Sequence, residues 1–222
     1  MNYQFYASFL NLSNIPKHEK ELSQPSYRQF LIGKVGKTIP LIKTLAPSLQ
    51  KTVIKPQRLH RDDVNYYIAT DMMTNTYYIC YRTLLMIDID YYKHEKQRSK
   101  DELLTMIDNY CDQHKDYRFF IYSTRNGLHV FLVSHHMDYK SVQALQIMID
   151  LDCDFYYVVY SYIRGWSVRL NKKKNEEDDQ LYHFITDLGH GKIDPLLLKL
   201  VNLHINLVGV FKDVRPNLMY GG

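Results

Sequence analysis

The chain lacks any apolar run long enough to cross a membrane. No apolar stretch approaches the ~18 residues that a transmembrane helix requires. The first residues, MNYQFYASFLNLSN, contain neither the basic segment nor the small-residue cleavage site of a secretory signal. We therefore expect an intracellular protein.

Cysteine is scarce as well. The three cysteines, Cys80, Cys111 and Cys153, are widely spaced, and no CxxC pair occurs. An odd number of isolated cysteines argues against a disulfide framework and a zinc ribbon, and it favours a reducing compartment.

Internal repeats and low-complexity segments are absent. The 222 residues are 45% hydrophobic and 23% charged, which is enough for one sizeable domain and too apolar for a disordered chain. We expect a catalytic or binding core over residues 62–222. Residues 1–61, broken by five prolines, should form a small helical or irregular region packed on this core.

The net charge of +4 hides an uneven distribution. Residues 1–61 carry ten basic and two acidic residues, so this part has a charge of +8 and the remainder a charge of −4. Aromatic residues are interleaved with these basic ones: Tyr3, Phe5, Tyr6, Phe9, Tyr27 and Phe30. Such a composition suits a phosphate backbone with stacked bases, or it is a solvated basic surface whose aromatic side chains turn into the core.

The pattern from residue 64 onward predicts an α+β domain with a mainly antiparallel or mixed sheet. Strands are expected in VNYYIAT, TYYICY, LLMIDID, RFFIYS, LHVFLVS, WSVRL and QLYHFIT. Ser99 and Glu102 form a capping box before one helix, and Asp194 with Pro195 predicts the start of a C-terminal helix. Apolar residues from Val142 to Ile149 predict a further amphipathic helix.

Two carboxylates stand two positions apart in the strand MIDID. Alternation places Asp88 and Asp90 on one face of this strand, while Ile87 and Ile89 point the other way. Each negative charge raises the cost of ionising the other. Either a divalent cation offsets this repulsion, or the strand runs out into solvent.

A second informative segment is YSTRNGLHVFL, which is expected to be a β-hairpin. It brings together a hydroxyl, a guanidinium, a permissive backbone and an imidazole, in Ser123, Arg125, Gly127 and His129. Where the strand is regular, odd positions share a face, so Arg125 and His129 would reach the same anion. A hydroxyl, exposed amides and a cation suit a triphosphate, whereas a lone histidine beside a turn is more often a surface or core residue.

The third segment is LDCDFYYVVYSYIRGWSVRLNKKK. Asp154 is here either a third metal ligand or the cap of a helix, and Asp152 is the alternative third acid. Arg169 and Lys172 either meet phosphate charge or belong to a solvated basic loop.

The order and spacing of these three segments resemble the archaeo-eukaryotic primase superfamily, and in particular the primase-polymerase catalytic cores of viruses, phages and mobile elements. The matching pattern is D-x-D at a strand end, S-x-x-x-G-x-H on a hairpin, then an aspartate followed by R-G-x-x-x-R-L-x-K. It covers about residues 64–174. No Cys/His zinc module and no phosphate-binding loop of a fused helicase is recognisable.

The resemblance implies a primase-like core built around a palm element similar to an RNA-recognition motif (RRM). It implies a DNA primase or polymerase that acts on a single-stranded DNA template with nucleoside triphosphates, beside a separate helicase. Asp88, Asp90 and Asp154 would be catalytic and would hold Mg²⁺ or Mn²⁺. Nucleotide-binding roles would fall to Ser123, Arg125, Gly127, His129, Arg169 and Lys172. The protein would act in a prokaryotic cytoplasm or at a viral or mobile-element replication site.

Two other functions remain open. A primase-like fold without turnover would serve as a single-strand-binding or replication-initiation module, with the basic amino end carrying the function. A metal-dependent nuclease would use the same carboxylates, but no E-x-K pattern that would supply its general base accompanies them.

Overall fold

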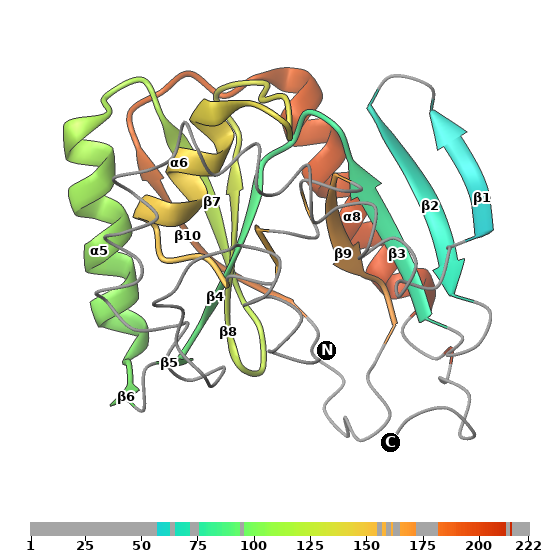
Figure 1. Ribbon diagram of the computed structural model, residues 1–222, viewed down its shortest axis with the longest axis horizontal. Coiled ribbons are helices and arrows are strands. Elements are labelled where there is room, and N and C mark those ends of the chain that lie inside the picture. Colours follow the sequence, from blue (N-terminus) through green and yellow to red (C-terminus); the bar gives the residue numbers. More distant parts are fainter. Residues whose placement is uncertain are drawn as a thin grey trace, which may run out of the picture.

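The computed structural model describes residues 57–62, 65–71, 76–93, 96–154, 157–158, 161, 165–171, 182–211 and 214. The basic region up to residue 56 and the lysine loop that contains Lys172 lie outside these ranges. The described part is an α+β fold with two four-stranded sheets and three helices (Figure 1).

The first sheet has the strand order β1 (Gln57–Asp62), β2 (Tyr66–Asp71), β3 (Thr76–Tyr81) and β9 (Trp166–Arg169). Each neighbouring pair is antiparallel. β1 crosses the expected boundary after residue 61, and its pairing with β2 joins the end of the amino-terminal region to the core.

The second sheet has the order β10 (His183–Gly189), β7 (Arg118–Ser123), β8 (Gly127–Leu132) and β4 (Met86–Asp90). β8 runs antiparallel to both β4 and β7, so β4 and β7 run in the same direction. Helix α5 (Lys100–Gln113) connects them, which makes a split β-α-β unit with β8 inserted between its strands. A two-residue ladder, β5 (Tyr92–Lys93) with β6 (Lys96–Gln97), precedes α5.

The helices cover the second sheet and connect it to the first. α5 and α6 (Val142–Asp150) lie beside the second sheet, and α8 (Pro195–Phe211) runs where the two sheets meet (Figure 1). On α8, the Phe211 ring stacks on that of Tyr77 of β3, with centroids 4.7 Å apart. The His204 ring lies against that of Phe131 of β8, with centroids 5.6 Å apart. α8 therefore packs against both sheets.

The predicted helix starts are confirmed. Ser99 and Glu102 make both hydrogen bonds of the capping box at the start of α5. The Asp194 side chain accepts from the backbone N–H groups of Leu196 and Leu197, at 2.8 and 3.1 Å, at the start of α8. These contacts satisfy N–H groups that have no partner within the helix.

The expected α+β domain with a mainly antiparallel sheet is confirmed, because every described strand pair is antiparallel. β4 does not continue the β1-β2-β3 meander but pairs with β8 in the other sheet. All three cysteines are buried and none forms a disulfide. None of the helices within the described ranges is both long enough and apolar enough to cross a bilayer.

Candidate functional site

The acid pair lies on β4, directly beside His129 of β8. In the antiparallel register Asp88 is opposite His129, and Asp90 is opposite Gly127. Residues directly opposite each other point to the same face of a sheet, and His129 Nε2 lies 3.4 Å from Asp88 Oδ1. The Asp88 side chain is 32% exposed and that of His129 14%. The structure therefore brings His129 next to Asp88 and Asp90, from which it is 41 and 39 positions away in the sequence.

Gly127 allows β8 to approach β4 closely beside the acid pair. A Cβ atom at position 127 would lie 2.0 Å from the carbonyl oxygen of Ile89 and 2.9 Å from the Cα of Asp90. The turn itself is closed by Thr124, whose backbone N–H donates to the Gly127 carbonyl at 2.9 Å. Close packing against the β4 backbone is therefore enough to explain why position 127 is a glycine.

We expect Gly127→Ala to lower the free energy of unfolding by about 1–3 kcal/mol, the usual cost of overpacking. The overlap is with backbone atoms of β4, which cannot move aside without disturbing Asp90. Chemical denaturation of the variant and the parent measures the loss. Unchanged stability would show that the two strands separate easily at this end.

Ser123 lies on the other side of the sheet from His129. Its partner in the register is Leu128, a fully buried residue of the core, whereas Tyr122 is opposite His129. Arg125 is exposed in the turn between β7 and β8. The residue that shares the face of His129 on β7 is therefore Tyr122, and Ser123 is not brought to the acid pair.

Asp154 lies next to the acid pair through its backbone. Its N–H donates to the Asp88 carbonyl at 2.8 Å, so residue 154 follows α6 back to the free side of β4. Its side-chain Oδ1 accepts from the N–H of Tyr157 at 2.8 Å, a helix-capping contact. Asp154 therefore caps the following helical segment, as one of the two interpretations of the sequence expected, and its role as a third metal ligand stays a prediction.

Asp152 is held in a buried ion pair. Arg98 Nη1 lies 2.5 Å from Asp152 Oδ2, and the two side chains are 15% and 5% exposed. The backbone of Asp152 has a φ of 57°, in the left-handed region that non-glycine residues rarely adopt. Arg98 did not stand out in the sequence, because its partner is 54 positions away.

Arg169 belongs to the other sheet. It lies on β9, opposite Tyr78 of β3. Lys172 lies outside the described residues. Arg169 is thus placed on the first sheet, whereas Asp88 and Asp90 lie on the second.

A buried histidine lies behind His129. His204 on α8 is fully buried, and neither of its ring nitrogens has a hydrogen-bond partner among the described residues. The Tyr182 ring lies between the two histidines, with its centroid 4.8 Å from that of His204 and 5.0 Å from that of His129. Burial, and secondarily the nearby His129, lower the pKa of His204 from 6.5 to about 3. No sequence pattern pointed to His204, which occupies an ordinary core position of an apolar helix.

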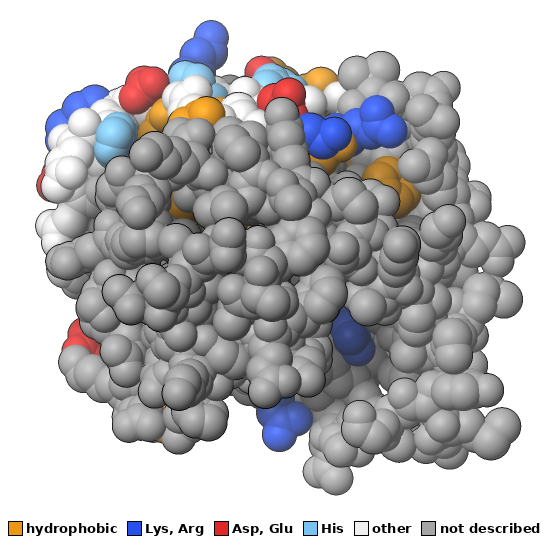
Figure 2. Space-filling model, in the orientation of Figure 1, with side chains coloured by type: hydrophobic (Ala, Val, Ile, Leu, Met, Phe, Trp, Pro, Cys, Tyr) orange, Lys and Arg blue, Asp and Glu red, His pale blue; other side chains and the backbone are white. Residues whose placement is uncertain are grey.

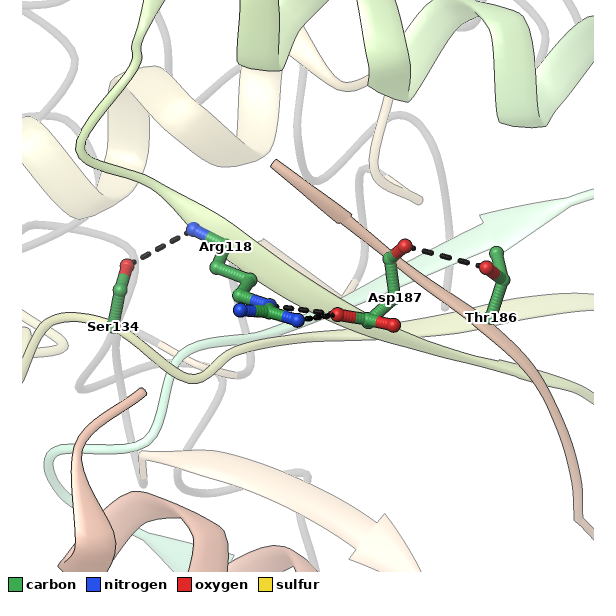
Figure 3. Close-up of polar contacts among 4 residues, drawn as sticks. All are labelled: Arg118, Ser134, Thr186 and Asp187. Atoms are coloured by element: carbon green, nitrogen blue, oxygen red, sulfur yellow. Dashed lines mark hydrogen bonds and ion pairs between the residues drawn. The ribbon is translucent and has the colours of Figure 1, made fainter. Parts of the chain in front are cut away.

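Other charged side chains pair with one another away from the acid pair. Figure 2 shows acidic, basic and histidine side chains mixed along the upper edge of the molecule. In the loops after α5 and β8, His135 pairs with Asp116 at 3.4 Å, and His136 pairs with Asp194 at 3.2 Å. Figure 3 shows that Arg118 of β7 pairs with Asp187 of β10, and its backbone N–H donates to Ser134 Oγ at 3.0 Å. These pairs explain the charges concerned without reference to a ligand.

The acid pair is compatible with a divalent cation, although it is not a complete ligand set by itself. Among the described residues, no group of three His, Cys, Asp or Glu side chains is arranged to hold a metal ion. Mg²⁺ commonly binds through only one or two carboxylates, with water and substrate phosphates completing its octahedron. Asp88 and Asp90, on one face of one strand, supply that number.

Comparison with known proteins gives no relative for this chain. No family model, no curated protein and no solved structure matches it.

Proposed function

We propose that this chain is a metal-dependent nucleotidyltransferase of the primase-polymerase kind, which makes or extends a primer on a single-stranded DNA template. The observation that carries the proposal is the grouping of Asp88, Asp90 and His129. Two carboxylates and an imidazole from adjacent strands lie on one face at the edge of the sheet. This combination suits the binding of a nucleotide triphosphate through a cation, because carboxylates hold the metal and an imidazole donates to phosphate oxygen.

In the proposed site, residues of β4 bind the cation and a residue of β8 binds the nucleotide. Asp88 and Asp90 hold Mg²⁺ or Mn²⁺, which would neutralise triphosphate charge and favour attack by a primer hydroxyl. His129 donates a hydrogen bond from its imidazole to a phosphate oxygen, which a neutral or protonated ring can do. The 3.4 Å contact with Asp88 keeps the imidazole next to the carboxylate.

The topology of the second sheet supports the same proposal. β4, α5, β7 and β8 form a split β-α-β unit with an added hairpin strand, the connectivity expected of an RRM-like palm. The acid pair is on the first strand of this unit and His129 on the third, and these two strands are neighbours in the sheet. Asp154 returns to β4 after the second helix and is the proposed third acid.

A second candidate function is single-strand binding without turnover. Phe184 on β10 is 53% exposed and lies opposite Tyr122 in the register, on the sheet face of His129. Its ring centroid is 5.6 Å from that of Phe120 and 5.4 Å from that of Tyr122. Exposed aromatic rings on a sheet provide stacking platforms for bases. Phe184 is the exposed ring of this cluster, whereas Tyr122 is buried, so Phe184 would be the base-stacking residue of a binding module.

Nucleotide incorporation separates the two candidates. The full chain is incubated with a primed and an unprimed single-stranded template, labelled ribo- or deoxynucleotides and Mn²⁺, and the products are sized. Elongated products that disappear when EDTA is added support the transferase. A protein that shifts the template in a gel but never extends a primer would favour the binding module.

We expect His129→Ala to lower the catalytic efficiency for nucleotide by about 10- to 100-fold. Loss of one charge-assisted hydrogen bond is worth roughly 1.5–3 kcal/mol. Template binding without nucleotide should hardly change, because the imidazole contacts phosphate of the triphosphate only. Steady-state kinetics at saturating Mn²⁺ measures the effect, with His190→Asn, an exposed histidine on a loop, as the control. Full efficiency in the His129 variant would exclude this role.

A further inference from the structure

Arg98 connects the strand of the acid pair to the segment of the proposed third acid. It lies between β6 and the capping residue Ser99, and its side chain is 15% exposed. One guanidinium nitrogen, Nη1, donates to Asp152 Oδ2 at 2.5 Å, and the other, Nη2, donates to the backbone carbonyl of Asp90 at 2.5 Å. One side chain therefore holds two segments that are about 60 positions apart.

Arg98 makes one contact at a proposed metal ligand and the other two positions before one. Asp90 is itself one of the acid pair, and the carbonyl that accepts from Arg98 is its own. Asp152 is two positions before Asp154, whose N–H donates to the Asp88 carbonyl at 2.8 Å. The guanidinium thus fixes the end of β4 and the 152–154 segment relative to each other.

The geometry explains why an arginine is used at this position. A planar guanidinium presents several N–H donors in a fixed fork, so it can satisfy a carboxylate and a carbonyl at once. Lysine would keep the positive charge but present it as a single point. The backbone N–H of Arg98 also donates to the Tyr91 carbonyl at 2.7 Å, which holds the residue beside the end of β4.

We propose that Arg98 is a positioning residue that holds the acid-bearing ends of β4 and the 152–154 segment at the spacing required for cation binding. The proposal rests on the proposed function, because it assumes that Asp88, Asp90 and Asp154 bind the cation. Arg98 itself contacts neither cation nor nucleotide. Its effect is on the affinity of the site for the metal, and turnover at saturating metal is largely retained.

The test compares Arg98→Lys with Arg118→Lys in the full chain. Arg118 is a matched control because it also pairs with an aspartate, Asp187, on the same sheet but away from the acid pair. Binding of Mn²⁺ alone is measured from the electron paramagnetic resonance signal of the free ion, and the Mn²⁺ dependence of nucleotide incorporation is measured in parallel. Thermal unfolding without metal is recorded for each protein.

Arg98→Lys should weaken Mn²⁺ binding by about 10-fold or more, the range seen when groups that orient metal ligands are lost. The Mn²⁺ concentration for half-maximal incorporation should rise by the same factor, while the rate at saturating Mn²⁺ recovers. Arg118→Lys should keep the metal affinity of the parent. A merely structural ion pair would lower thermal stability in both variants and leave the Mn²⁺ affinity of the folded protein unchanged, which would overturn the proposal.

A second variant covers the case in which Arg98→Lys does not fold. If Arg98→Lys does not fold, the double variant Arg98→Met with Asp152→Asn removes both buried charges together, and it should show the same loss of Mn²⁺ affinity. A folded double variant that binds Mn²⁺ as the parent does would overturn the proposal. If the parent binds Mn²⁺ but incorporates no nucleotide, the proposed function fails while the binding measurement still decides the role of Arg98. A parent that does not bind Mn²⁺ would overturn both.

Discussion

Replacing Asp88 or Asp90 by alanine is expected to abolish nucleotide incorporation while the fold remains intact. Asp88 and Asp90 supply two of the cation ligands of the proposed site, and among the described residues no group of three His, Cys, Asp or Glu side chains is arranged so that another could replace either one. We expect a loss of at least about 10²–10³-fold, the scale on which loss of a single group that stabilises transition-state charge acts. Primer extension at several Mn²⁺ concentrations measures the loss.

The stability of the same variants separates a functional pair from a structural one. Asp88 makes a partly exposed contact with His129, and contacts of this kind contribute only about 0–1 kcal/mol. Removing one of two neighbouring negative charges also relieves repulsion when no cation is present. Thermal unfolding without metal should therefore change little. A marked drop in melting temperature in both variants would identify the pair as a structural element.

Asp108→Ala provides the control for the general effect of removing an acid. Asp108 is an exposed residue on α5, and α5 packs on the sheet through its other side. This variant should extend primers at the parent rate. Equal activity of the Asp88, Asp90 and Asp108 variants would remove the basis of the enzyme proposal and leave the single-strand-binding candidate.

Local features of the fold could be predicted from the sequence because neighbouring residues determine them. The capping box at Ser99 and Glu102 and the Asp194-Pro195 helix start depend on side chains within three positions of the backbone groups they serve. The β7–β8 hairpin likewise follows from two β-rich runs that flank a short turn. In each case the physical cause is contained in a short window of sequence.

Strand partnership could not be predicted in this way. The runs TYYICY and LLMIDID follow each other directly and were expected to be consecutive strands, but the sequence did not show that β4 pairs with β8, some 40 positions further along. Pairing between distant strands depends on how the helices cover the sheet, which no short pattern contains. The split β-α-β arrangement was implied only by the family resemblance.

The position of Ser123 shows a specific limit of alternation. Alternation along a regular strand put Arg125 and His129 on one face, and the resemblance grouped Ser123 with them at the nucleotide. In the observed register, paired residues have opposite parity, so Tyr122 is opposite His129 and Ser123 is opposite Leu128. Alternation holds along one strand, but the length of the turn determines how the two strands match.

Replacing His204 by phenylalanine is expected to stabilise the fold and to make its stability less sensitive to acid. The two ring nitrogens of His204 have no hydrogen-bond partner among the described residues, and the ring is surrounded by aromatic side chains. An unsatisfied buried polar atom costs about 1–3 kcal/mol. An apolar ring at this position would pack against Phe131 and Tyr182 without that cost. Urea denaturation at pH 7.5 measures the gain, and His204→Leu covers the case in which phenylalanine is too large.

Replacing His204 should change the pH dependence of the free energy of unfolding more than it changes the stability at pH 7.5. Burial lowers the pKa of His204 to about 3 in the folded protein, whereas in the unfolded chain it lies near the ordinary 6.5. Between these values the unfolded chain binds a proton that the folded protein does not, so the free energy of unfolding falls as the pH is lowered. At 1.36 kcal/mol per unit of pKa difference, the parent should lose about 3 kcal/mol from this group between pH 6.5 and pH 4. The free energy of unfolding of His204→Phe should fall by about 3 kcal/mol less than that of the parent over the same pH range. His190→Asn, which removes an exposed histidine instead, should follow the parent.

Parallel pH profiles of the parent and His204→Phe would contradict this prediction. They would mean that His204 is protonated in the folded protein, so that the core around Tyr81, Phe131 and Tyr182 admits a charge.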